Sequence, residues 1–246
     1  MYSFVPLCVL RVLVVCLFNL SNLQMKKSIT IIGLMICLSS VAQSGFPVTY
    51  LNSPDTSKPL IFYITGDGGM NKFSKSLAEE LNHRGFPVAS LDAKSYFWVK
   101  KTPASAASAI STYIEALLLR RPTARIVLAG YSFGADVFPF IVNALPAPTR
   151  ARISTVILVA PSANTDLEIH WSDMLGWNKK RSNDVASAIN QMSVPRVLAI
   201  FADADKDDLP VSSIHLKNFS SKVLPGGHHF DGQSQVLAGV ITGSLP

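Results

Sequence analysis

Apolar runs and amphipathic stretches alternate along most of the chain. The apolar runs are rich in β-branched residues, which is typical of buried strands, and they occupy residues 60–65, 88–91, 125–130, 155–160, 196–202 and 221–224. The stretches between them have helical spacing of apolar positions, which predicts helices at residues 71–84, 104–121, 133–145, 183–192 and 233–242. This alternation predicts an α/β fold, with a mostly parallel sheet and helices on both of its faces.

One connection, residues 161–182, is longer than a simple crossover needs. It contains His170, Trp171 and Trp177, followed by the basic cluster Lys179-Lys180-Arg181. Connections of this length without a clear helix or strand pattern are often lids or binding loops. A solvated run of charges beside two half-buried indoles is the other interpretation.

Residues 1–42 differ from the rest of the chain and predict a targeting region. They contain Arg11, Lys26 and Lys27 but no acidic residue. Met25 begins a basic segment, residues 29–38 are apolar, and Ser40-Val41-Ala42 resembles a signal-peptide cleavage site. We therefore expect translation to start at Met25 and a signal peptide at residues 25–42. A membrane anchor formed by the apolar residues 4–20 is the alternative.

Composition limits what the remaining residues 43–246 can be. The chain has 246 residues, 48% of them hydrophobic, which is enough for one sizeable core but not for two enzyme domains. All three cysteines precede residue 43, so thiols say nothing about the compartment of the mature protein. Without the three basic residues of the leader, the formal net charge of +6 falls to +3. No basic run interleaved with aromatic residues suggests nucleic acid as a partner.

The motif that carries chemistry is Gly130-Tyr131-Ser132-Phe133-Gly134. It matches G-x-S-x-G, the sharp strand-to-helix turn that raises a serine nucleophile above the sheet. The pattern alone is weak, but a predicted strand precedes it and a predicted helix follows it. Ser132 is therefore the candidate nucleophile.

A serine hydroxyl needs a base, and the base needs a carboxylate that holds its tautomer. Both occur downstream in the order Ser, Asp, His that is typical of the α/β-hydrolase fold. Asp205 follows a late predicted strand and is the candidate acid, with Asp203 as the alternative. His228, in the loop after the last predicted strand, is the candidate base, with His229 as the alternative.

The loop Gly66-Asp67-Gly68-Gly69 follows the first long predicted strand. We expect an oxyanion hole made by the backbone amide of Phe133 and one from Asp67 or Gly68. A phosphate-binding loop is the competing interpretation, but no G-x-x-x-x-G-K-S/T pattern is present. The pair His228-His229 has no further ligand set around it, so we expect no metal and no cofactor.

Several stretches together resemble one known family. They are Thr65-Gly66-Asp67-Gly68-Gly69, Tyr96-Phe97-Trp98 with Lys101-Thr102-Pro103, residues 130–136, Leu145-Pro146 before Arg150, residues 166–170 with Leu175-Gly176, and residues 225–232. In these pieces the chain is similar to the bacterial virulence protein family of VirJ and the C-terminal domain of AcvB. It departs at Met70, where the family pattern has tryptophan, and this affects the expected shape of the pocket.

The resemblance implies an exported, periplasmic α/β hydrolase linked to virulence. It also implies an activity, the hydrolysis of lysyl-phosphatidylglycerol, and it supports Ser132 and the loop of His228 and His229. Because a lysyl ester carries an ammonium group, a carboxylate should bind it, and Asp136 and Glu168 are the candidates. For Asp136, a position on the helix outside the pocket is the alternative. The partners expected are a lipid or small ester substrate, an anionic membrane surface and secretion-system components. A non-catalytic periplasmic adaptor of a secretion system is the alternative function.

Overall fold

The computed structural model describes residues 45–122, 124–169 and 181–246. The helices and strands of these described residues all lie in the second of the two units into which the chain divides, Pro47–Pro246. Seven strands of the described residues form one sheet in the order β1-β3-β2-β4-β5-β8-β9. Strand β1 pairs antiparallel with β3, and the other neighbouring pairs are parallel. The strands are β1 (Val48–Leu51), β2 (Leu60–Ile64), β3 (Val88–Leu91), β4 (Ile126–Tyr131), β5 (Ile153–Val159), β8 (Val197–Ala202) and β9 (Phe219–Leu224).

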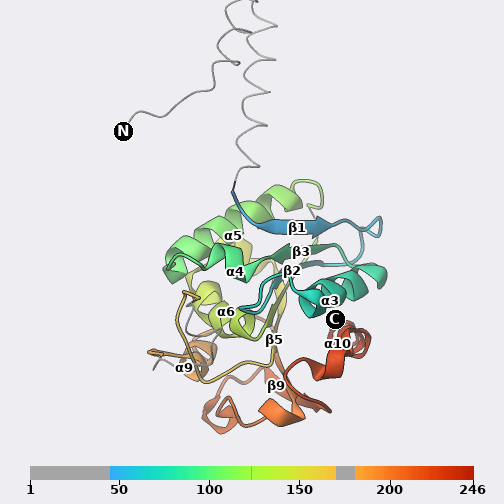
Figure 1. Cartoon of the computed structure of the whole chain (residues 1–246). Coiled ribbons are helices and arrows are strands. Elements are labelled where there is room, and N and C mark those ends of the chain that lie inside the picture. Colours follow the sequence, from blue (N-terminus) through green and yellow to red (C-terminus); the bar gives the residue numbers. More distant parts are fainter. Residues whose placement is uncertain (1–44, 123, 170–180) are drawn as a thin grey trace, which may run out of the picture. The chain divides into compact units, whose positions relative to one another are not determined.

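Helices cover both faces of this sheet. Figure 1 shows α3 and α10 on one side, and α5, α6 and α9 on the other. The longer helices are α3 (Lys72–His83), α5 (Pro103–Leu118), α6 (Phe133–Ala144) and α10 (Ser234–Thr242); the shorter ones are α4 (Ala93–Tyr96), α7 (Ala147–Ala151) and α9 (Val185–Asn190). None of the helices in the described part of the chain is long and apolar enough to span a membrane.

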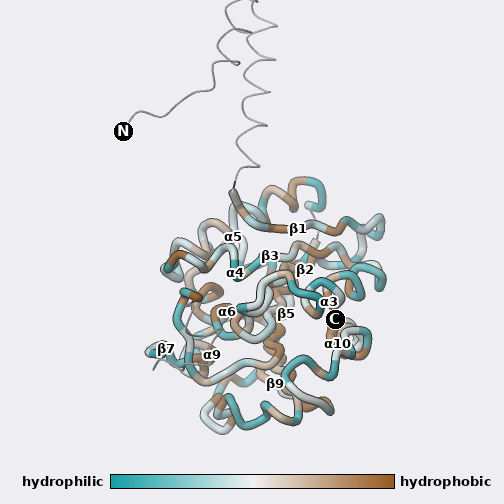
Figure 2. The backbone as a smooth tube through the Cα atoms, in the orientation of Figure 1, coloured by the Kyte–Doolittle hydropathy of each residue, from teal (hydrophilic) through white to brown (hydrophobic). Residues whose placement is uncertain are grey.

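The core follows from the period of two along each strand. Ile61 and Tyr63 of β2 pack with Leu77 of α3 and Leu237 of α10. Phe62, between them in the sequence, points to the other face, where its ring lies 6.4 Å from that of Tyr113 in α5. Figure 2 shows hydrophobic residues through the middle of this unit near β5 and hydrophilic residues at outer segments such as β7 (Asn183–Asp184). Both faces of the sheet are therefore buried at its five inner strands, as a parallel sheet requires.

Local sequence explains where the helices start. Asn71 accepts a hydrogen bond from the amide of Ser74 and caps α3. Thr102 and Ser105 form a reciprocal capping box before α5, with Pro103 at its first position.

The predicted fold class is confirmed. All six predicted strands and five predicted helices are present, with ends shifted by at most three residues. Strand β1, the short helices α4 and α7, and the two-stranded pair β6 (Asn164–Thr165) and β7 were not predicted. Each is short, and β1 lies at the edge of the sheet, where half-buried residues give a weak apolar signal.

The strand order creates a natural place for a ligand. Strand β2 lies between β3 and β4 in the sheet. The chain therefore runs from β2 to β3 on one side of β2, and then crosses back to β4 on the other side. In open α/β sheets, ligands bind outside the carboxyl ends of the strands where the order reverses in this way. The carboxyl ends of β2 and β4 lead into the loop at Gly66 and into Ser132.

Candidate active site

Ser132 stands in a strained turn between β4 and α6. Its φ of 51° and ψ of −120° are unusual for a residue with a side chain, and such strain costs about 1–3 kcal/mol. The surrounding backbone holds it there. The amide of Ser132 donates to the carbonyl oxygen of Val159 at 2.8 Å, and its own carbonyl oxygen accepts from Ala135 at 2.8 Å and Asp136 at 3.0 Å. This is the geometry of a nucleophile elbow.

The two glycines of the motif let the helix approach the sheet. A β-carbon at Gly130 would overlap the backbone of Gly134, and one at Gly134 would overlap the carbonyl oxygen of Ile64 in β2. Both positions therefore exclude every other residue unless the backbone moves. Close packing of α6 on β2 and β4 places the start of the helix directly behind Ser132.

The structure brings Ser132, His228 and Asp205 together in one hydrogen-bonded chain. Ser132 Oγ lies 2.9 Å from Nε2 of His228, and Nδ1 of His228 lies 2.5 Å from Oδ2 of Asp205. With the proton on Nδ1 donated to Asp205, Nε2 is free to accept the proton of the serine hydroxyl. These are the three residues that the sequence favoured.

The alternative residues have other partners. Asp203 is exposed and forms an ion pair with Lys206 at 3.1 Å. The ring of His229 lies edge-on to Phe73, with centroids 5.6 Å apart. Neither makes a hydrogen bond with Ser132 or His228 among those of the described residues, so Asp205 and His228 are the candidates that join Ser132 in the hydrogen-bonded chain.

The two loops that carry acid and base are fastened to each other and to the elbow. Asp205 ends a short 3-10 turn, Asp203–Asp205, directly after β8. The amide of Ala204 in this turn donates to the carbonyl oxygen of Gly226, at 3.3 Å. The hydroxyl of Tyr131 donates to the carbonyl oxygen of His228, at 3.1 Å. Sequence reasoning missed Tyr131, although it occupies the second position of the G-x-S-x-G motif.

The expected oxyanion loop lies beside the nucleophile. A β-carbon at Gly66 would be 3.5 Å from that of Ser132. The amide of Gly69 donates to the carbonyl oxygen of Gly66 at 2.9 Å and closes a turn that contains Asp67 and Gly68. Phe133 begins α6, where backbone amides have no acceptor within the helix. The predicted oxyanion donors therefore gather at the same edge of the sheet as Ser132.

Asp136 and Glu168, the predicted ammonium ligands, occupy different environments. Asp136 is only 3% exposed, and its two carboxylate oxygens accept from the amide of Ser162 at 2.6 Å and from its hydroxyl at 2.7 Å. Burial raises the pKa of this carboxyl to about 7. The hydrogen bonds from Ser162 and the charges of the nearby Arg181 and His228 lower the pKa, but they do not outweigh burial. Nothing in the sequence pointed to Ser162.

Glu168 is half-buried, on a segment joined to the nucleophile side of the site. The amide of Ile169 donates to the carbonyl oxygen of Phe97 at 2.9 Å. The ring of Phe97 in turn meets that of Phe133 edge-on, with centroids 5.2 Å apart. The role of Glu168 as an ammonium ligand stays a prediction.

Part of the predicted lid lies outside the described residues. This applies to His170, Trp171, Trp177, Lys179 and Lys180. Arg181 is described and half-buried, and its charge acts on Asp136. The interpretation of residues 161–182 as a lid stays a prediction. Its described ends carry the paired strands β6 and β7.

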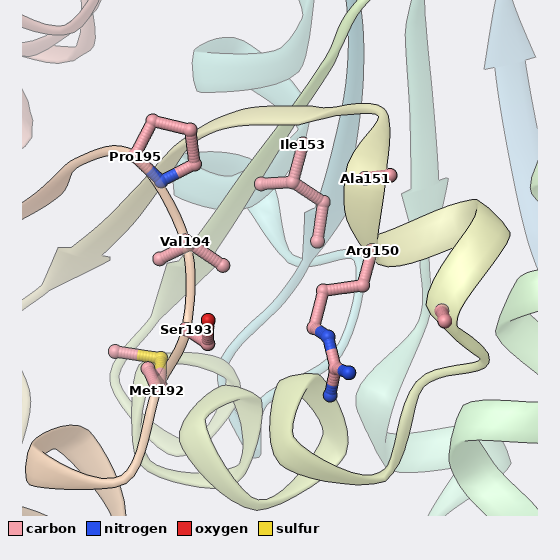
Figure 3. Close-up of a pocket in the computed structure, with 8 residues that line it drawn as sticks. Arg150, Ala151, Ile153, Met192, Ser193, Val194 and Pro195 are labelled. Atoms are coloured by element: carbon pink, nitrogen blue, oxygen red, sulfur yellow. The ribbon is translucent and has the colours of Figure 1, made fainter.

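Two surface pockets lie at different distances from this site. One, of about 420 Å³, adjoins the histidine loop and is lined by Asn71, Lys72, Phe73, Ser76, His229 and Gly232. The other, of about 550 Å³, lies between α7 and the connection from α9 to β8 (Figure 3). Its residue Ile153 begins β5, so it adjoins the amino ends of the strands, opposite the edge that carries Ser132. Within the described residues, no group of three or more His, Cys, Asp or Glu could hold a metal ion.

Solved structures similar to this chain are α/β hydrolases. Est1E from Butyrivibrio proteoclasticus matches with a TM-score of 0.57 and 16% identity over 82% of this chain and 94% of that one. A lipase-esterase related protein from Clostridium acetobutylicum matches with a TM-score of 0.57 and 14% identity over 80% and 99%. MenH from S. aureus matches with a TM-score of 0.57 and 13% identity over 80% and 96%. At these identities the matches establish the α/β-hydrolase fold.

Sequence comparison identifies the family. No curated protein matches the chain. The family described as Bacterial virulence protein (VirJ) matches residues 59–245, a span that runs from β2 to the end of α10 and includes the elbow, the acid turn and the histidine loop. The chain therefore belongs to the VirJ family of bacterial virulence proteins and has the fold of a hydrolase.

Proposed function

We propose that this protein is a serine esterase with Ser132 as nucleophile, His228 as base and Asp205 as the acid that orients the base. The observation that carries this proposal is the hydrogen-bonded chain from Ser132 through His228 to Asp205 at a strained elbow. The three side chains come from separate loops and meet at one edge of the sheet. Their arrangement supports the roles of nucleophile, base and orienting acid that acyl transfer requires.

The geometry supports a two-step reaction. Nε2 of His228 takes the proton of Ser132 as its oxygen attacks the acyl carbonyl, and Asp205 stabilises the imidazolium that forms. Amides of Phe133 and of Asp67 or Gly68 stabilise the oxyanion, a contribution of about 3–4 kcal/mol per donor in other serine hydrolases. His228 then returns the proton to the leaving alcohol, and a water molecule releases the acyl group from Ser132 by the same path in reverse.

We further propose that the substrate is an aminoacylated phospholipid such as lysyl-phosphatidylglycerol, and that the protein acts in the periplasm in a virulence setting. Family membership supports the virulence setting, and the signal-like residues 25–42 support export. Glu168 is the more accessible candidate for the lysyl ammonium, because its side chain is half-buried whereas Asp136 is 3% exposed. N-terminal sequencing of the exported protein tests the leader: the expected first residue is Gln43, and a full-length cytoplasmic chain would contradict export.

Two assays test the activity and the substrate separately. The purified wild type should react with a fluorophosphonate probe, which labels activated serines, and Ser132→Ala should not. A panel of lysyl-phosphatidylglycerol, phosphatidylglycerol and small soluble esters then compares lipid preference. A folded wild type that neither labels nor hydrolyses any ester would favour the adaptor function instead. Labelling with no hydrolysis of the aminoacyl lipid would reject only the substrate.

A further inference from the structure

The nucleophile elbow is held by a closed circuit of hydrogen bonds that passes through Asp136. The amide of Ser132 donates to the carbonyl oxygen of Val159, the last residue of β5. Two residues later in the chain, Pro161 leads into Ser162, whose amide and hydroxyl donate to the carboxylate of Asp136. The amide of Asp136 donates back to the carbonyl oxygen of Ser132. Ser132 is thus held on both sides by one circuit.

This circuit contains two strained backbone positions. Ser132 has a φ of 51°, and Ala160, between Val159 and Ser162, has a φ of 48°. Residues with side chains hold such conformations only where the surroundings fix them. The amide of Ala160 donates to the carbonyl oxygen of Ile200 at 2.7 Å, in the strand that leads to Asp205. The exit of β5 therefore joins the nucleophile to the strand of the acid.

The carboxylate in this circuit is an unusual choice for a purely structural position. Asp136 lies one helical turn after Ser132 and is 3% exposed, and burying a carboxylate is unfavourable. An uncharged residue would fill the same volume without that desolvation. A residue that is retained although it destabilises the folded protein is typical of functional sites.

We propose that Asp136 is a positioning residue of the esterase site: its carboxylate holds Ser162, and thereby holds the carbonyl of Val159 that anchors the amide of Ser132. It acts through other residues and does not touch the substrate. The inference rests on the proposed esterase function and adds to it a group outside the three reacting side chains. Loss of the carboxylate should let the exit of β5 relax and move Ser132 Oγ away from its position 2.9 Å from Nε2 of His228.

The test uses variants that keep the shape of the site. Asp136→Asn keeps one acceptor for the amide of Ser162 but replaces the oxygen that accepts from its hydroxyl. Ser162→Ala removes only that hydroxyl. Asp184→Asn is the matched control, because Asp184 also accepts from a serine amide, that of Ser187 at 2.9 Å, but in the cap of α9. Full-length proteins are compared by steady-state hydrolysis of a soluble ester and by the time course of fluorophosphonate labelling.

Misplacement and unfolding affect labelling differently. A displaced Ser132 lowers the rate constant of labelling while every molecule still labels in the end, whereas a fraction of irreversibly misfolded protein lowers the final extent. We expect Asp136→Asn to lower kcat and the labelling rate constant by roughly 10- to 100-fold, with full final extent and unchanged KM. Ser162→Ala should lower both by roughly three- to tenfold, and Asp184→Asn should behave as the wild type.

Three results from the variants would overturn the inference. The first is an Asp136→Asn protein with a wild-type labelling rate constant. The second is a lower final extent at an unchanged rate constant, which would make the role structural. If Asp136→Asn does not fold, Ser162→Ala decides by the same two criteria, and a wild-type rate constant there is the third. A wild type that does not label would reject the proposed function and, with it, this inference.

Discussion

Asp136→Asn should stabilise the folded protein at neutral pH, although we expect it to impair the site. Burial raises the pKa of the Asp136 carboxyl in the folded protein from 3.8 to about 7. At pH values between 3.8 and about 7, the Asp136 carboxyl is therefore protonated in the folded chain and ionised in the unfolded chain. The stability of the wild type therefore falls as pH rises through this window. Arg181 and His228 face the carboxyl and lower its pKa, and that lowering is already contained in the value of about 7.

The size of the effect follows from the shift. About three units correspond to roughly 4 kcal/mol of stability that the wild type has lost by pH 8. Asparagine avoids this loss but gives up the hydrogen bond from the hydroxyl of Ser162, which is worth about 1 kcal/mol. At pH 8 the variant should therefore be more stable than the wild type by up to about 3 kcal/mol. At pH 4 it should be less stable by about 1 kcal/mol.

Urea unfolding from pH 4 to pH 8, followed by circular dichroism, measures this difference. The wild type should lose stability relative to Asp136→Asn as pH rises, with most of the change between pH 4 and pH 7. Asp184→Asn, measured in the same way, is the matched control for the loss of a carboxylate that accepts from a serine amide. A free-energy difference between Asp136→Asn and the wild type that is the same at pH 4 and pH 8 would show that Asp136 titrates alike in the folded and unfolded states, contrary to this prediction.

Three further predictions concern the base, its support and the basic cluster. His228→Ala should lower kcat for a soluble ester by roughly a million-fold, and His229→Ala should retain most activity; the reverse result in steady-state kinetics would exchange their roles. Tyr131→Phe removes the bond to the carbonyl oxygen of His228 and should lower kcat by about tenfold at unchanged KM; a wild-type kcat would show that the histidine loop is held without it. Replacing Lys179 and Lys180 with serine should weaken binding to anionic liposomes by roughly 30-fold, at about 1 kcal/mol per residue, and leave soluble-ester hydrolysis unchanged. Equal co-sedimentation of variant and wild type at low salt would show that these two lysines do not bind an anionic membrane surface.

The order of strands and helices could be predicted because each has its own signal, a continuous apolar run for a buried strand and a helical spacing of apolar positions for a helix. Residues 60–65 and 88–91 show the strand signal, and both are buried strands in the structure. The edge strand β1 could not be predicted in this way, because its residues are half-buried or exposed. Short elements such as α4 offer too few positions for a period to emerge.

The residues of the candidate site also differ in whether local sequence could predict them. Ser132 follows from a local motif, and Asp205 and His228 from their places after predicted strands. The choice of His228 over His229 depends on which ring turns toward Ser132, and this is set by contacts such as that of His229 with Phe73 in α3. The partnership of Asp136 with Ser162 joins α6 to the exit of β5. Such contacts between segments distant in the chain leave no trace in a single sequence.

Fluorophosphonate labelling of the purified full-length protein, read by intact-mass spectrometry beside the Ser132→Ala variant, tests whether Ser132 is an activated nucleophile. We expect one adduct per wild-type molecule, located on Ser132 by peptide mapping, and none on the variant, with both proteins equally folded by circular dichroism. A folded wild type that stays unlabelled, or an adduct that persists in Ser132→Ala, would contradict this expectation.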